Sequence, residues 1–306
     1  MKTPQFSIIT PTFNRSSQLR RAIESILAQT HTDYELIVID DGSTDDTQVM
    51  LNEFAGLERI SIVKQSNQGA SAARNNGIKQ ARGRYICFLD SDDVFTPDHL
   101  EKTASDISRQ PDIQAFSSKL QFKRKSTNYI KPFKAYNNTQ PLDEYLLCDR
   151  GSFLMVSLTV ESEVARQCLF NTQISYGDDI EFVIKLWKKG CEFYSQTHIG
   201  AIIDDRSDDS RLSRSLQVRQ IDSLLSELRP WISDKAYLGA QGWFLAKSYA
   251  LDKRHQEAAK LYLSAIKHNC YSIKMSLIVA AQVFLPVPVY YWVSSVVGKL
   301  SKASLS

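Results

Sequence analysis

The sequence predicts an α/β fold, in which a mainly parallel β-sheet is flanked by helices and followed by an all-helical C-terminal appendage. The first observation lies in the first third of the chain, where short apolar runs rich in β-branched and aromatic residues alternate with amphipathic stretches. Alternation at this spacing indicates parallel strands joined by helical crossovers. The second observation is that, from about Arg211 onward, helical patterns follow one another with no strand-like run between them.

Four strands are expected in the first third, because continuous apolar runs of this length are typical of strands buried on both faces. Their sequences are FSIIT, YELIVID, RISIVK and YICFLD. After the first, SQLRRAIESILAQT places Leu19, Ile23, Ile26 and Leu27 on one face of a helix. A second helix begins with the capping residues of TDDTQVMLNEFA, and a third, in ASAARNNGIKQARG, ends at Gly83. In such sheets, ligands bind at the carboxyl ends of the strands.

The middle of the chain is predicted to add strands in IQAFSSKLQF, GSFLMVSLTV and CEFYSQTHIGAII. Residues 123–138 are basic, polar and aromatic, which favours an exposed loop or hairpin. DDIEFVIKLWKKG predicts a helix, since acids in its first turn and lysines in its last turn complement the helix dipole, and Gly190 can end it. We therefore place one domain at residues 1–215 and a helical region at 216–306.

The helical region carries a repeat-like pattern at about residues 240–270. Its small and aromatic residues have the spacing of the tetratricopeptide helical hairpin, and they are Ala246, Tyr249, Ala258, Tyr262 and Ala265. One such repeat cannot bury its own faces. We therefore expect a helical appendage packed on the main domain, rather than a peptide-binding array, and a surface through which the chain can form homo-oligomers.

Residues 276–298 form a stretch without a single charged side chain, bracketed by Lys274 and Lys299. Its length reaches the roughly 17–25 residues that a membrane-spanning helix needs, but Pro286 and Pro288 interrupt it. Three interpretations remain open. The favoured one is a membrane-surface or re-entrant segment, and the others are a buried core or dimer helix and a true membrane span.

Composition narrows the classes of function. A net charge of +3 over 306 residues gives no case for binding nucleic acid. Five scattered cysteines without a CxxC pair argue against a disulfide framework and a zinc site, and they fit a reducing compartment. The start, MKTPQFSIITPTF, lacks the features of a signal peptide. We expect a cytoplasmic protein with a peripheral contact to the inner face of the cell membrane through 276–298.

Two acidic clusters follow predicted strands. In FLDSDD, Asp90 and Asp92 point the same way, since side chains alternate in an extended segment, and such oxygens suit Mg²⁺ or Mn²⁺. The alternative is a turn and helix start, because Pro97 and Asp98 follow closely. In VIDDGSTDDT, acids at a strand end can accept hydrogen bonds from a nucleotide base or ribose.

Neither a G-x-G-x-x-G after the first strand nor a G-x-x-x-x-G-K-[ST] occurs in the sequence. A sheet that binds a nucleotide without a glycine-rich phosphate loop needs another way to neutralise the diphosphate. A metal ion held by Asp92 would provide it.

Five motifs, taken together and in order, resemble the family 2 glycosyltransferases with the GT-A fold over roughly residues 5–215. They are SIITPTFNR, ELIVIDDGSTDDT, NQGASAARNNGI, GRYICFLDSDD and YGDDIEFVIKLWKKG. A saccharide acceptor is expected, or a lipid-linked one if residues 276–298 rest on a bilayer. The resemblance implies that a sugar moves to this acceptor from a nucleotide diphosphate donor, and a UDP-sugar is expected first. It also implies inversion at the anomeric carbon and a divalent metal cofactor, Mn²⁺ or Mg²⁺.

The resemblance assigns roles to individual positions. Asp41 reads the base beside Asp40, Asp90 meets the ribose or a metal-bound water, and Asp92 holds the metal. Other nucleotide-binding positions are Pro11, Thr12, Asn14, Asn67, Gly69 and Arg74. Weaker matches for a loop over the diphosphate are Arg206, Arg211 and Ser213.

The family's catalytic base lies in a Glu-Asp pair that opens a helix, and the corresponding pair here is Asp178-Asp179. Because the first position departs from glutamate, both acids remain candidates, with Asp179 preferred. The alternative role for either acid is helix capping, which stabilises by roughly 0.5–2 kcal/mol.

Two other functions compete. A nucleotidyltransferase would carry a glycine- and basic-rich loop after the first strand, whereas TPTFNRSSQ has no glycine. A non-catalytic adaptor could bind partners through the helical region, although acids at Asp41, Asp92 and Asp179 argue against a sheet that has lost its activity.

Overall fold

The computed structural model describes residues 3–123, 128–149, 151–204, 217–286 and 289. The chain divides into two compact units. The first comprises Met1–Leu142 and Arg150–Arg211, and the second comprises Asp143–Asp149 and Leu212–Ser306. The second unit thus takes in a short segment from the middle of the sequence in addition to the C-terminal helices.

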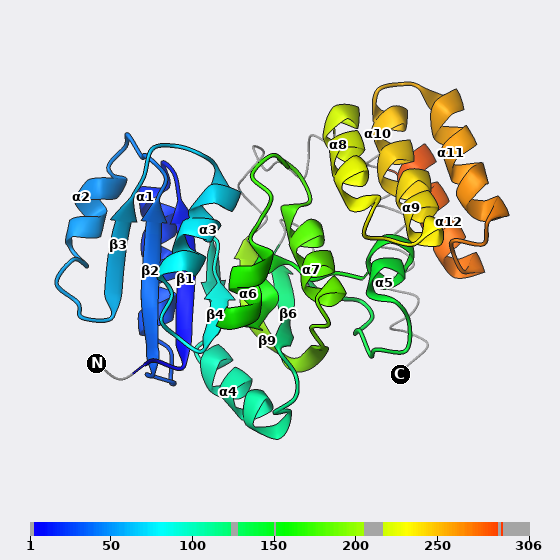
Figure 1. The fold of residues 1–306 in the computed structure, drawn as a ribbon. Helices are drawn as coiled ribbons and strands as arrows, with labels where there is room; N and C mark the ends of the chain where they lie inside the picture. Colours follow the sequence, from blue (N-terminus) through cyan, green and yellow to red (C-terminus); the bar gives the residue numbers. More distant parts are fainter. Residues whose placement is uncertain (1–2, 124–127, 150, 205–216, 287–288, 290–306) are drawn as a thin grey trace. The chain divides into compact units, whose positions relative to one another are not determined.

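The first unit is built on one mixed sheet, whose described strands follow the order β3-β2-β1-β4-β8-β6-β9-β5, with β7 paired to β6 (Figure 1). Its parallel part contains β1 (Phe6–Thr12), β2 (Tyr34–Asp40), β3 (Ile60–Lys64) and β4 (Tyr85–Phe88). These are the four strands expected from the first third of the sequence. In their register Thr12 lies beside Asp40, and Ile9 lies beside Phe88, two residues before Asp90.

The other part of the sheet is largely antiparallel. β8 (Leu158–Glu161) runs antiparallel to both β4 and β6 (Ala115–Lys123), and β7 (Asn128–Lys131) forms a hairpin with β6. β9 (Phe193–Asp204) is parallel to β6. The short β5 (Asp93–Phe95) pairs with β9 in the antiparallel direction. The strand predicted over residues 151–160 is shorter than expected, because Met155–Ser157 form a 3₁₀ turn before it begins.

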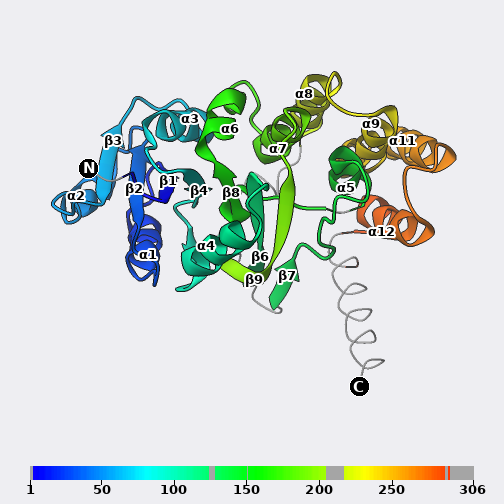
Figure 2. The same ribbon diagram turned by 60° about the horizontal axis from the view of Figure 1, so that its bottom comes forward.

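Helices cover both faces of this sheet, which explains why β1 and β2 are buried along their whole length. Figure 2 shows α3 (Ala70–Gln80), α6 (Ser162–Cys168) and α7 (Asp178–Lys188) on one face. On the other face lie α1 (Ser16–Leu27) and α4 (His99–Arg109). Leu19, Ile23 and Ile26 of α1 are fully buried as predicted, whereas Leu27 is exposed because α1 ends there. A further helix, α2 (Thr47–Asn52), follows β2.

A cluster of aromatic rings fastens α7 to the sheet. Phe182 of α7 stacks on Phe170 with ring centroids 4.1 Å apart, and both rings meet Phe88 of β4 edge-on. All three are buried. Aromatic pairs of this geometry stabilise by about 0.5–1.5 kcal/mol beyond the apolar area they bury. The start of α7 is therefore held close to the carboxyl end of β4.

The second unit is helical. Its elements are α5 (Leu142–Cys148), α8 (Val218–Leu228), α9 (Asp234–Ala240), a π-helical turn (Gln241–Leu245), α10 (Ala246–Leu251), α11 (His255–Lys267) and α12 (Ile273–Phe284). The small residues of the repeat-like pattern lie where helices meet, since Ala246, Ala258 and Ala265 are fully buried. Gly242 packs so closely on α11 that an added Cβ would lie 2.4 Å from the Cβ of Ala265.

Helix α12 ends at Phe284, so it contains only the first part of the uncharged stretch 276–298. Residues 287, 288 and 290–298 lie outside the described residues. Among the described residues, no helix has the length and apolar character needed to cross a membrane.

The packing at Gly242 can be tested by Gly242→Ala. Alanine favours an exposed helix by about 1 kcal/mol over glycine, but overpacking against Ala265 costs about 1–3 kcal/mol, so we expect a lower free energy of unfolding in denaturant titrations. Gly56→Ala is the matched control, because its new methyl group meets open space. A variant at position 242 as stable as wild type would show that the two helices are not in close contact.

Candidate active site

The acids predicted to act together lie at one edge of the first unit, where parallel strands end. Asp40 ends β2, Asp90 follows β4, and Asp178 opens α7. This is the edge at which open α/β sheets bind their ligands. The contacts between these segments, rather than their positions in the sequence, define the site.

Arg74 of α3 connects three parts of the site. Its Nη2 donates to Asp90 Oδ1 at 2.7 Å and its Nη1 donates to Asp178 Oδ2 at 2.8 Å. The guanidinium also lies over the ring of Phe170, 5.5 Å from the centroid. Arg74 is only 7% exposed. Burial opposes its charge, but Asp90 and Asp178 outweigh that effect and raise the pKa of Arg74 above its ordinary value.

Asp178 and Asp179 have different surroundings although they are neighbours. Asp178 is bound by Arg74 and also accepts a hydrogen bond from Ser71 Oγ at 3.1 Å. Asp179 is half-buried, and its Oδ1 accepts from the amide of Ile180 at 2.8 Å. Burial, followed by the neighbouring Asp178 carboxylate, raises the pKa of Asp179 to about 7, against the opposing charge of Arg74.

Helix capping does not account for this pair. The residue before α7 is Gly177, whose φ of 77° lies in the left-handed region that glycine adopts readily. Neither acid occupies the capping position. Both instead belong to the first turn, where the helix dipole favours negative charge.

Asp41 organises the loop that leads into α3. Its Oδ1 accepts from Gln68 N and from Gln65 Nε2, both at 2.8 Å, and its Oδ2 accepts from Gly69 N at 2.7 Å. Gly69 adopts a φ of 88°, which lets its amide turn toward the carboxylate. Asn67 lies exposed in this loop. Asp40 similarly holds its own turn, accepting from Ser43 N at 3.0 Å and from Gln48 Nε2.

The residues that follow β1 are tied to the turn after β2. Pro11 and Thr12 belong to β1, and the Thr12 carbonyl accepts from Asp41 N at 2.9 Å. Thr12 Oγ1 is buried and has no hydrogen-bond partner among the described residues. Asn14, with φ 52°, accepts from Thr44 N at 2.7 Å. Together these contacts tie the end of β1 to the turn that follows β2.

Arg15 is a site residue that sequence reasoning missed. Its Nη1 lies 2.8 Å from Asp92 Oδ2, so the acid predicted to hold a metal is paired with the arginine that directly precedes α1. Ser71, Gln65 and Gln68 were also missed. The only available signal for Arg15 was its position directly after Asn14; the others depend on contacts between distant segments.

The donor set at Asp90 and Asp92 fits a hard divalent cation bound together with a substrate. Each carboxylate has one oxygen paired with an arginine, Asp92 with Arg15 and Asp90 with Arg74. Within the described ranges, no group of three His, Cys, Asp or Glu side chains could hold a metal. Mg²⁺ and Mn²⁺ are commonly held by one or two carboxylates, with phosphate oxygens and water completing the shell.

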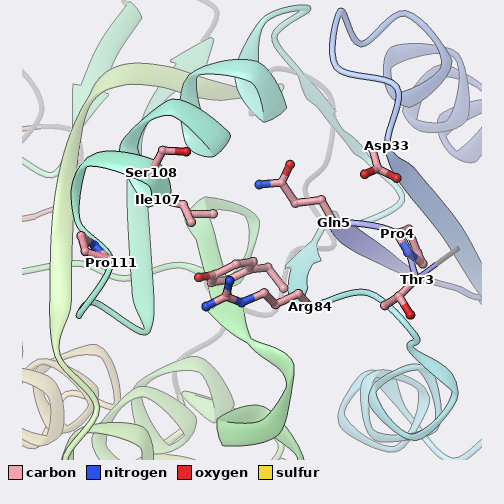
Figure 3. Close-up of a pocket in the computed structure, with 9 residues that line it drawn as sticks. Thr3, Pro4, Gln5, Asp33, Arg84, Ile107, Ser108 and Pro111 are labelled. Atoms are coloured by element: carbon pink, nitrogen blue, oxygen red, sulfur yellow. The ribbon is translucent and has the colours of Figure 1, made fainter.

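Arg206, Arg211 and Ser213, predicted for the diphosphate loop, fall outside the described residues. A pocket of about 520 Å³ lies at the opposite end of the strands (Figure 3). It contains none of the predicted site residues and is lined by Thr3, Pro4, Gln5, Asp33, Arg84, Tyr85, Ile107, Ser108 and Pro111.

Comparison with known protein families identifies the family of this chain. The model of the family described as "Glycosyl transferase family 2" matches residues 7–159, half of the chain. The chain belongs to glycosyl transferase family 2. The matched region contains the three strand ends at Thr12, Asp40 and Asp90 and also Arg74, while α7 follows it.

Several curated relatives of this family 2 chain are bacterial. It is 31% identical over 147 residues to the putative glycosyltransferase EpsH of Bacillus subtilis, a match covering 48% of this chain and 43% of that one. It is 43% identical over 101 residues to the putative teichuronic acid biosynthesis glycosyltransferase TuaG of the same organism, covering 32% of this chain and 40% of that protein. The matches therefore span less than half of these relatives.

Solved structures confirm the predicted fold class. Staphylococcus aureus TarS 1–349 in complex with UDP-GlcNAc superposes with a TM-score of 0.63 at 16% identity, over 92% of this chain and 84% of that one. The mannosyltransferase PcManGT from Pyrobaculum calidifontis, in complex with GDP-Man and Mn²⁺, gives 0.60 at 18% identity, over 96% and 84%. At these identities the likeness shows the fold alone.

The two acids of α7 can be distinguished by their protonation. We expect a carboxyl ¹³C NMR titration to give Asp179 a pKa of about 7. Arg74→Gln should raise it further, because the charge of Arg74 favours the ionised carboxylate, whereas Arg74→Lys, which keeps the charge, should change it less. An Asp179 pKa near the ordinary value of about 3.9 would contradict this account of the site.

Proposed function

We propose that this chain is an inverting glycosyltransferase that moves a sugar from a nucleotide diphosphate, a UDP-sugar in the first instance, to a hydroxyl of a saccharide or glycolipid acceptor. The observation that carries the proposal is the contact of Arg74 with both Asp90 and Asp178. It brings the acids that follow β4 next to the acids that open α7. A donor site and a catalytic base are needed at the same place, and the two contacts of Arg74 support the proposal that this edge provides them.

The reaction is a single displacement. The acceptor oxygen attacks the anomeric carbon while Asp179 accepts its proton, and the bond between that carbon and the diphosphate oxygen breaks on the opposite face. A carboxylate is too weak a base to remove an alcohol proton beforehand, so proton transfer accompanies attack. A pKa of about 7 suits this role, since it allows a large ionised fraction near neutral pH together with a useful affinity for the proton.

Asp179 is assigned as the base in preference to Asp178 because of their partners. Oδ2 of Asp178 accepts from both Arg74 and Ser71, which hold the carboxylate in place. Its proposed role is to position Arg74 and thereby Asp90. Asp179 projects from the same turn and has only the amide of Ile180 as a hydrogen-bond donor among the contacts described here.

The donor is proposed to lie along the ends of β1, β2 and β4. Asp41, with Asp40 beside it, would read the base, and the segments of Pro11, Thr12, Asn14 and Asn67 would surround the nucleotide. A divalent ion held by Asp92 and Asp90 would act as Lewis acid for the charge that develops on the diphosphate.

Known relatives support the substrate class. The TarS structure is a complex with UDP-GlcNAc, and the PcManGT structure is a complex with GDP-Man and Mn²⁺. TuaG is described as a putative teichuronic acid biosynthesis glycosyltransferase. For this chain we accordingly propose a nucleotide-sugar donor, Mn²⁺ or Mg²⁺ and a role in polysaccharide synthesis.

The first test is a thermal-shift panel of nucleotide sugars with and without Mn²⁺. A donor at 100 times its Kd adds about 2.7 kcal/mol of stability, so the true donor should stand out by a higher midpoint, and Asp92→Asn should abolish the metal-dependent part. Product analysis separates the alternatives. Release of a nucleoside diphosphate supports the proposal, pyrophosphate chemistry would indicate a nucleotidyltransferase, and no turnover with any donor would favour an adaptor.

The second test compares the two acids of α7. Asp179→Asn should lower turnover by about 10²–10⁴-fold while donor affinity changes little. Asp178→Asn should instead weaken donor binding and stability, because it releases Arg74. Wild-type turnover should increase as the pH rises through about 7, where Asp179 ionises, and decrease below it. Normal turnover by Asp179→Asn would refute the assignment of the base.

A further inference from the structure

Helix α12 of the second unit has two apolar faces, and only one is packed. Met275, Val279 and Val283, spaced by four residues, are buried in a cluster with residues of α10 and α11. On the other side, Ile273 is 86% exposed, Leu277 is 68% exposed and Phe284 is 41% exposed. Spacings of four and seven residues place these three side chains on one helix face. Single exposed apolar residues are ordinary, but a contiguous face indicates an interaction surface.

Two more large apolar side chains are exposed after the end of α12. Leu285 and Val289 are also exposed, so large apolar side chains face solvent at five positions between residues 273 and 289. None of these residues belongs to the candidate active site. The surface is therefore available for a role of its own.

The last part of the sequence, which includes α12, contains lysines but no acidic residue. All 34 acidic residues of the chain lie before residue 258, about one in every eight positions, so a stretch of 49 residues would hold about six. Residues 258–306, which number 49, contain five lysines and no Asp or Glu. Lys260, Lys267 and Lys274 are exposed on or beside α11 and α12. Exposed lysines on and beside α12, next to exposed apolar side chains, complement an anionic lipid headgroup layer.

Other occupants fit this face less well. A second copy docking through the same face would bring like-charged lysines together, which is unfavourable in a symmetric contact. Helix α12 is also too short to cross a membrane. Its 12 residues extend about 18 Å, whereas the hydrocarbon core is about 30 Å thick. A helix lying in the membrane surface needs only one apolar face to be buried, and its lysines can reach the headgroups.

We propose that the face of α12 formed by Ile273, Leu277 and Phe284 docks this chain on the surface of a membrane that contains anionic lipid. The apolar side chains insert at the level of the headgroups, and the exposed lysines contact lipid phosphates. This goes beyond the proposed glycosyltransferase activity and does not depend on it.

The test is co-sedimentation of the full chain with lipid vesicles. Vesicles of phosphatidylcholine containing phosphatidylglycerol should bind the chain, vesicles of phosphatidylcholine alone should bind it weakly, and high salt should reduce binding because it screens the lysines. Ile273→Glu and Leu277→Glu should each lower the partition coefficient about tenfold or more, as expected for the loss of one inserted aliphatic side chain. Val49→Glu is the matched control, since Val49 is 68% exposed on a helix of the first unit.

Folding and oligomeric state are measured alongside. The variants should keep the wild-type unfolding midpoint and rate of donor hydrolysis, because the altered side chains face solvent. No binding to anionic vesicles, equal binding to neutral ones, or wild-type binding by both variants would overturn the proposal. Dissociation of a wild-type dimer by Ile273→Glu, seen by light scattering, would assign the face to a second copy and overturn it as well. Because donor hydrolysis is measured separately, failure of docking leaves the proposed activity standing.

Discussion

The site depends on one buried cation. A guanidinium that is 7% exposed is stable only when its charge is matched, and Arg74 is matched by one carboxylate from the end of β4 and another from the start of α7. Removing either acid would leave the arginine partly unpaired. The contact therefore fixes α3, β4 and α7 relative to one another at the edge where the proposed reaction takes place. The ring of Phe170 also covers one face of the Arg74 guanidinium.

The same carboxylates that are proposed to handle a substrate also hold the protein together. Asp41 accepts three hydrogen bonds from the loop before α3, and Asp92 is paired with Arg15. These contacts keep the carboxylate side chains in one orientation. An edge organised in this way needs little rearrangement when a donor binds, and preorganisation of this kind is a large part of catalysis.

Local pattern was sufficient to predict much of this. The four apolar runs of the first third form β1 to β4, and Asp40 and Asp90 lie at or just after strand ends. These features could be predicted because a few adjacent residues determine where a buried strand forms and where it ends. The pattern failed where it was uniform or short. Residues 151–154 are apolar in part but precede the strand, and the three-residue β5 exists only because β9 pairs with it.

What the sequence by itself determined is therefore the class of fold, the strand ends that carry acids and the pair that opens α7. Tertiary structure decided how the surroundings of Asp178 and Asp179 differ. Arg74 lies 16 residues from Asp90 and 104 from Asp178, and no local rule selects those partners. It also decided that α12, apolar almost throughout, buries one face and exposes the other. In both cases the outcome depends on packing between distant segments, which sets the solvent exposure and the electrostatic surroundings of each side chain.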